Sequence, residues 1–173
     1  MLISEDYRAL QRALHESPDY GVASLGFVGS VRKLIEAFGV RSVTDYGAGK
    51  QNLRKGLEAA GVVVDYRPYD PAFPEYGAPL PADLVCCIDV LEHIEPDHLG
   101  AVLDDLRRVT TVRGFFTIHT GPARKVLADG RNAHLIQEPL EWWLPRLEAH
   151  FRVIQTQATD GGFIAVVEPR AAA

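Results

Sequence analysis

A glycine-rich segment and two aspartates are the residues best suited to bind a small molecule. Gly47 and Gly49 lie between a predicted strand and a predicted helix, and glycines there let the main chain turn sharply and approach a ligand without a Cβ clash. Asp70 ends the next predicted strand, where a carboxylate can accept hydrogen bonds from ribose hydroxyls. This spacing predicts a nucleotide-binding crevice at the carboxyl ends of parallel strands.

The same segment argues against a dinucleotide as the ligand. The dinucleotide pattern Gly-x-Gly-x-x-Gly needs a third glycine where this chain has Asn52. Asp45 stands two residues before the first glycine, and its carboxylate would repel a pyrophosphate. It would instead attract the ammonium group of a methionine moiety, directly or through water. Lys50, after the second glycine, is interpreted as a solvated residue at the start of a helix.

Alternating strands and helices must position these residues. We predict strands at 41–45, 62–69, 83–88, 114–119, 151–158 and 162–168, and helices at 5–16, 24–38, 52–60, 99–109 and 140–150. Ser24 is predicted to cap the second helix and Gly39 to end it. Residues 71–81 and 121–138 are predicted loops, and Asp83 is expected to be structural. This order predicts an α/β fold, a mostly parallel, doubly wound sheet with an antiparallel C-terminal hairpin.

The composition fits a single domain over residues 1–173, with residues 1–23 as an N-terminal helical extension and candidate lid. Hydrophobic residues make up 47% of the chain and charged residues 24%. The net charge of −5 argues against a nucleic-acid partner, although a local basic patch is compatible with it. No apolar run suits a membrane span or a signal core, so we expect a cytoplasmic protein. Cys86 and Cys87 are predicted to be buried thiols of a reducing compartment.

Three motifs in order resemble those of the class I S-adenosylmethionine-dependent methyltransferases. Residues 45–49 are similar to their Asp/Glu-x-Gly-x-Gly motif, Asp70 to their ribose-binding acid, and residues 83–94 to their fourth-strand motif. The resemblance covers about residues 24–168 and implies a Rossmann-like fold, S-adenosylmethionine as cofactor and methyl transfer as activity. The residues implied to bind the cofactor are Asp45, Tyr46, Gly47, Ala48, Gly49, Asp70, Pro71, Asp89 and Val90.

One part of the family pattern is missing. Residues 71–81 are too short and too rich in proline to form the family's usual third strand with its acidic adenine contact. We expect Pro71, Ala72 and Phe73 to supply apolar packing for the adenine instead.

Methyl transfer requires alignment of the reactants, and it needs a base only when the acceptor has a proton to lose. Position along the chain makes five residues candidates for the catalytic or acceptor site: His93, His119, Arg131, Asn132 and His134. Each histidine has an alternative interpretation as a hydrogen-bonded structural residue, and Arg131 as an exposed loop charge. Trp142 and Trp143 are interpreted mainly as helix packing.

The leading hypothesis is a methyltransferase for a small-molecule acceptor, such as a sugar, a nucleotide or a secondary metabolite. A first alternative rests on residues 89–93 and on His134 before Glu141-Trp142, which are similar to the small-RNA 3′-terminal 2′-O-methyltransferases. That similarity implies a metal-assisted RNA or nucleoside 2′-O-methyltransferase with magnesium or manganese bound by Asp89, Glu92, His93 and His134. A second alternative is a non-catalytic module that binds S-adenosylmethionine.

Overall fold

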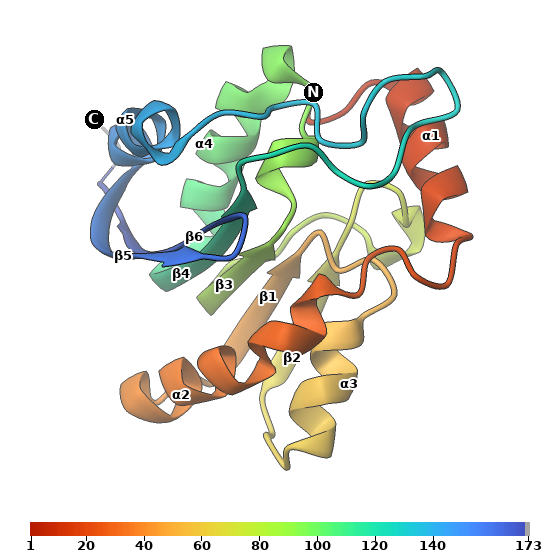
Figure 1. Ribbon diagram of the computed structural model, residues 1–173. Coiled ribbons are helices and arrows are strands. Elements are labelled where there is room, and N and C mark those ends of the chain that lie inside the picture. The colour runs from red at the N-terminus through yellow and green to blue at the C-terminus, as the bar shows by residue number, and fades with distance from the viewer. Residues whose placement is uncertain (172–173) are drawn as a thin grey trace.

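A six-stranded sheet forms the centre of the computed structural model, which describes residues 1–171 (Figure 1). The strand order is β2-β1-β3-β4-β6-β5. The first four strands in this order are parallel, and β6 is antiparallel to both of its neighbours. The predicted α/β fold, with a mostly parallel sheet and an antiparallel C-terminal hairpin, is therefore confirmed. The strands are β1 (Ser42–Tyr46), β2 (Asp65–Tyr69), β3 (Ala82–Ile88), β4 (Thr110–His119), β5 (Phe151–Thr159) and β6 (Gly162–Pro169).

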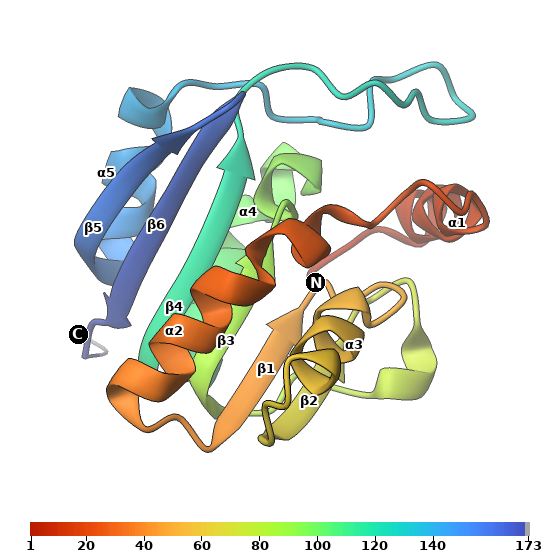
Figure 2. The same cartoon turned by 60° about the horizontal axis from the view of Figure 1, so that its bottom comes forward.

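Helices cover both faces of the sheet, as predicted. Figure 2 shows a front layer of helices and a rear layer with the sheet between them. The front pair is α2 (Val28–Phe38) and α3 (Asn52–Ala59), and the rear pair is α4 (Leu99–Val109) and α5 (Leu140–His150). Side chains of β3 alternate between these layers: Leu84 and Cys86 pack with α2 and α3, whereas Val85 and Cys87 pack with α4 and α5. A strand buried on both faces carries apolar side chains on both, which explains the uninterrupted hydrophobic run from Leu84 to Ile88.

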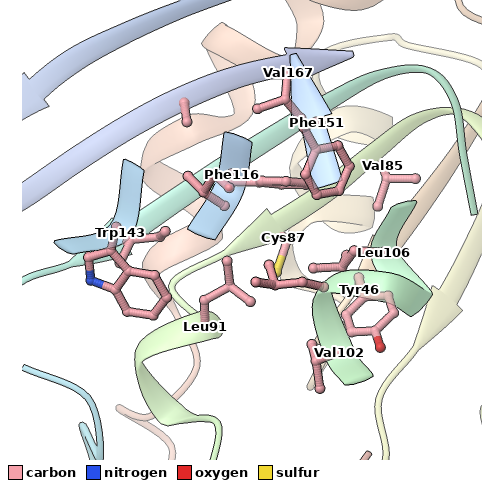
Figure 3. Packing of buried hydrophobic residues seen from close by; sticks show 14 of the residues in the cluster. Tyr46, Val85, Cys87, Leu91, Val102, Leu106, Phe116, Trp143, Phe151 and Val167 are labelled. Carbon is pink, nitrogen blue, oxygen red and sulfur yellow. The ribbon is translucent and has the colours of Figure 1, made fainter. Parts of the chain in front are cut away.

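The core between the sheet and the rear helices is rich in aromatic residues. Figure 3 shows Trp143, Phe116 and Tyr46 around Cys87 and Leu91, and none of these five is more than 3% exposed. The free cysteines Cys86 and Cys87 are both fully buried, which confirms the expected burial of the thiols. This close-packed core holds the strand ends and the turn after β3 in place.

Three predicted boundaries differ from the structure by three or four residues. Ser24 does not cap α2, because it lies within a short 3-10 helix (Ala23–Phe27) that continues directly into α2 at Val28. Strand β2 begins at Asp65, three residues after its predicted start, because the amide of Val62 donates to the Leu57 carbonyl and completes the end of α3. Strand β4 begins at Thr110, four residues before its predicted start, because it follows α4 without a connecting loop. Gly39 does end α2, with a φ of 61° that favours glycine.

The N-terminal helix α1 (Glu5–His15) lies apart from the sheet, beyond the ends toward which β1, β3 and β4 point (Figures 1 and 2). Its N-cap, Ser4, accepts a hydrogen bond from the amide of Tyr7 and donates to the carboxylate of Glu95. The long connection over residues 120–139 passes along the same end of the molecule. Among residues 1–171, no helix is long and apolar enough to cross a membrane.

Candidate functional site

A cavity of about 610 Å³ opens at the carboxyl ends of the parallel strands. This volume falls in the range of small-molecule sites. Its wall is formed by the turn after β1, the ends of β2 and β3, helix α1 and the connection after β4. Every residue predicted to bind the cofactor lines it: Asp45, Tyr46, Gly47, Ala48, Gly49, Asp70, Pro71, Asp89 and Val90.

The glycine turn and Asp70 form one hydrogen-bonded unit. The ends of β1 and β2 are paired at Tyr46 and Tyr69, and the Tyr69 carbonyl accepts from the amides of Gly47 (2.7 Å) and Ala48 (2.9 Å). The carboxylate of Asp70 accepts from the amide of Gly49 at 2.9 Å. Gly47 has a φ of 88°, and a Cβ there would overlap the side chain of Val90. A bare main chain is therefore required at this wall of the cavity.

Two buried carboxyl groups face the cavity beside this turn. Asp45 is 3% exposed and accepts a hydrogen bond from the Tyr66 hydroxyl, and burial raises its pKa to about 7. Burial also raises the pKa of Asp70. Within residues 1–171, neither carboxyl pairs with a cationic side chain. The site is therefore suited to a ligand that brings its own hydroxyl donors or a positive charge.

The N-terminal extension forms the opposite wall. Lys50 donates from Nζ to the carbonyls of Ser17 (2.5 Å) and Tyr20 (3.2 Å), and Asn52 donates to the carbonyl of Gly21 (2.9 Å). The interpretation of Lys50 as a solvated residue was wrong, because these carbonyls replace water around its ammonium group. The contacts bind the segment after α1 directly to the glycine turn.

His15 is a cavity residue that the sequence reasoning missed. Its ring packs edge-on against Phe73 (5.0 Å between centroids) and Tyr20 (4.9 Å), and a Cβ on Gly49 would meet it at 2.9 Å. Burial, followed by the nearby charge of Lys50, lowers the pKa of His15 to about 4. The available signal was a histidine at the end of a predicted helix in the candidate lid, and no spacing rule connected it to the glycines.

Three of the predicted catalytic residues meet on another side of the cavity. The ring of His134 lies 4.7 Å from that of His93 and 4.9 Å from that of His119, and all three line the cavity. Nδ1 of His93 lies 2.8 Å from the carbonyl of Ala133, so it carries the proton and leaves Nε2 with a free lone pair. Burial lowers the pKa of both His93, to about 3, and His134.

The other two candidates do not line the cavity. Arg131 pairs with Asp129 at 2.7 Å and lies over the ring of Tyr7. Asn132 accepts hydrogen bonds from the amides of Ala123 and His134, both at 2.9 Å. The structure thus places Asn132 as a support for the loop that carries His134. Trp143 is fully buried and packs against Trp142, in agreement with the packing interpretation.

Three of the four predicted metal ligands also come together. One ligand atom each from Glu92, His93 and His134 lies within 4.8 Å of the others. Asp89 is not part of this group, and its carboxylate accepts from the Thr117 hydroxyl at 2.5 Å.

No protein-family model and no curated protein sequence matches the chain. Solved structures do match it. One match is the 1,6-didemethyltoxoflavin-N1-methyltransferase of Burkholderia thailandensis, solved with 1,6-didemethyltoxoflavin and S-adenosylhomocysteine bound. The two sequences are 17% identical, the TM-score is 0.64, and the match covers 99% of this chain and 92% of that chain. A second match is the magnesium protoporphyrin IX methyltransferase of Synechocystis PCC 6803, solved with S-adenosylmethionine bound. It is 17% identical with a TM-score of 0.61, and the match covers 97% of this chain and 98% of that chain.

The mitomycin 7-O-methyltransferase MmcR is 16% identical with a TM-score of 0.62, and the match covers 93% of this chain but 60% of that protein. These likenesses define the fold: the chain has the Rossmann-like fold of the class I S-adenosylmethionine-dependent methyltransferases.

Proposed function

We propose that this protein is an S-adenosylmethionine-dependent methyltransferase acting on a small-molecule acceptor. The main support for this proposal is that the glycine turn and Asp70 lie side by side in the wall of one cavity, where Asp70 accepts a hydrogen bond from the amide of Gly49. Asp70 keeps free lone pairs for ribose hydroxyls, because each carboxylate oxygen accepts more than one hydrogen bond. Asp45, buried beside the turn, is placed to attract the ammonium group of the cofactor, directly or through water.

The three histidines favour an enzyme over a non-catalytic binding module. A module would seal its cavity with apolar side chains, whereas His93, His119 and His134 line this one. A neutral imidazole with a free Nε2 can accept a hydrogen bond from the hydroxyl or amine of an acceptor and align it for methylation. Small acceptors named for proteins of this fold, a didemethyltoxoflavin among them, support the same class of substrate. We place the activity in the cytoplasm, because the free thiols of Cys86 and Cys87 fit a reducing compartment.

Calorimetry with S-adenosylhomocysteine tests the cofactor. Gly47→Ala is expected to weaken binding at least about tenfold, because the new Cβ overlaps Val90 and the φ of 88° is strained for alanine. Gly100→Ala is the matched control, since Gly100 lies in α4 with open space around its Cα. Equal affinities in the two variants would refute the assignment of the turn. Formation of S-adenosylhomocysteine with sugar, nucleotide and phenol acceptors then tests turnover.

A further inference from the structure

The two edges of the sheet differ in how they are protected against pairing with another chain. Strand β2 forms one edge, and Asp65, Arg67 and Pro68 lie within it. Edge strands commonly avoid such pairing through charged side chains and through proline, which has no amide hydrogen to donate. Strand β5 forms the other edge, and within residues 1–171 it pairs with β6 alone (Figure 2). An edge strand directs part of its main-chain amides and carbonyls outward, where a further strand can bind them.

Strand β5 has none of these protective residues over most of its length. Residues 153–159 contain no charged residue and no proline. The charged residue of this strand, Arg152, donates to Glu168 of the neighbouring β6 at 2.8 Å. A β-bulge lies between Val153 and Gln155, and residues 155–159 pair with β6 without interruption. A regular stretch of strand is therefore open to a further strand at this edge.

The helix layers leave residues 155–159 uncovered. Gln155 and Gln157 line a groove between β5 and α2, which places them on the front face of the sheet. Thr156 and Ala158 point to the rear face, because side chains alternate along a strand. All of residues 155–159 are exposed. A neighbouring chain can thus reach the outer edge of β5 from either face.

The side chains of this stretch suit a second copy of the same chain. A two-fold axis sets identical strands against each other in the antiparallel direction. With Gln157 on the axis, Thr156 faces Ala158 of the second copy, and Gln157 faces its own counterpart. An amide side chain both donates and accepts, so it hydrogen-bonds an identical amide. Like charges, which destabilise pairs of opposed residues, are not brought together at these positions.

We propose that two copies of this protein associate through their β5 strands, which pair in the antiparallel direction about a two-fold axis at Gln157. The two sheets then form one continuous sheet. An interface centred on a single strand is small, so the dimer is expected to be weak and to depend on concentration. This inference does not rest on the proposed methyltransferase function, because none of residues 151–159 lines the cavity.

Sedimentation velocity over a wide range of protein concentrations tests the interface. We expect the wild-type chain to show a monomer–dimer equilibrium. Gln157→Lys and Gln157→Glu each set like charges against each other on the axis, so each is expected to weaken association at least about tenfold. An equal mixture of the two variants sets opposite charges together, and its association should exceed that of either variant alone. Ala101→Lys and Ala101→Glu are the matched controls, because Ala101 is exposed on α4, and they should associate like the wild type.

Four outcomes would overturn the interface: a wild-type chain that stays monomeric, unchanged association in both Gln157 variants, a mixture no stronger than its components, or an equal loss in the controls. Circular dichroism and S-adenosylhomocysteine affinity, measured in parallel, should match the wild type in every variant. If a charged variant fails to fold, Gln157→Cys decides. A disulfide-linked dimer under mild oxidation supports the pairing, since Cys86 and Cys87 are buried, and a monomer overturns it.

Discussion

Replacing Asp70 with asparagine separates two roles of one carboxylate. Asp70 accepts amide hydrogen bonds from Gly49 at 2.9 Å and from Ala72 at 2.8 Å, one on each oxygen. An asparagine side chain has a single acceptor oxygen, so one of these buried amides loses its partner. That loss lowers the free energy of unfolding by about 1–3 kcal/mol. A ribose hydroxyl that loses its charged acceptor costs about 1–3 kcal/mol of binding free energy as well.

Asp83→Asn is the matched control for this experiment. Asp83 also accepts from two main-chain amides, those of Arg41 (2.9 Å) and Ser42 (3.1 Å), but both donate to the same oxygen. Asp83 lies at the start of β3 and does not line the cavity. Urea unfolding followed by circular dichroism measures stability, and calorimetry measures S-adenosylhomocysteine affinity. The single oxygen of an asparagine at position 83 can accept from both amides, so we expect Asp83→Asn to stay close to wild type in stability and affinity. We expect Asp70→Asn to be less stable and to bind S-adenosylhomocysteine more weakly, by roughly 5–150-fold. Wild-type affinity in Asp70→Asn, or an equal loss in Asp83→Asn, would refute the ribose contact.

Two further predictions concern the N-terminal extension. Lys50→Met removes the charged hydrogen bonds to the carbonyls of Ser17 and Tyr20, so we expect about 1.5–3 kcal/mol less protection of the extension in amide hydrogen exchange. Exposed Lys55→Met should change nothing, and equal exchange in the two variants would contradict the contact. Because the pKa of His15 falls from 6.5 to about 4 on folding, the unfolded chain binds more protons between these values. The contribution of His15 to the free energy of unfolding should therefore decrease as pH falls from 6.5 to 4, by about 1–2 kcal/mol after solvent screening of the partly exposed ring. His93, His134 and Asp45 titrate in both chains, so the difference between the wild type and His15→Gln measures this contribution. Urea unfolding across this range checks it, and His15→Gln with an unchanged slope would show that another group titrates.

The glycine turn could be predicted because its geometry is local. Gly47, Gly49 and the strand before them lie within eight residues, and the pairing of β1 with β2 follows from one strand-helix-strand unit. The position of Asp70 beside the glycines could be predicted from the same unit, because neighbouring parallel strands end at the same edge of a sheet. The antiparallel hairpin was equally local, because one two-residue turn joins β5 and β6.

Contacts between distant segments could not be predicted in this way. The amide of Ser4 donates to Glu95 across 91 positions, and this contact helps to set where α1 lies. His15 reaches the cavity only because α1 lies there, so no pattern near residue 15 reveals it. The convergence of Glu92 with His134 depends on the path of the connection after β4. It was expected only from the similarity of residues 89–93 and His134 to the small-RNA 2′-O-methyltransferases, since the pattern of the connection itself predicted a loop.

The way in which the N-terminal extension is held has an evolutionary consequence. Lys50 and Asn52 bind main-chain carbonyls of residues 17–21, and every amino acid supplies such a carbonyl. Side chains in that stretch are thus free to diverge among relatives while the attachment persists, provided that the two donors are kept. Since Asp19 and Tyr20 line the cavity, selection can alter the shape and polarity of the cavity wall without rebuilding the fold.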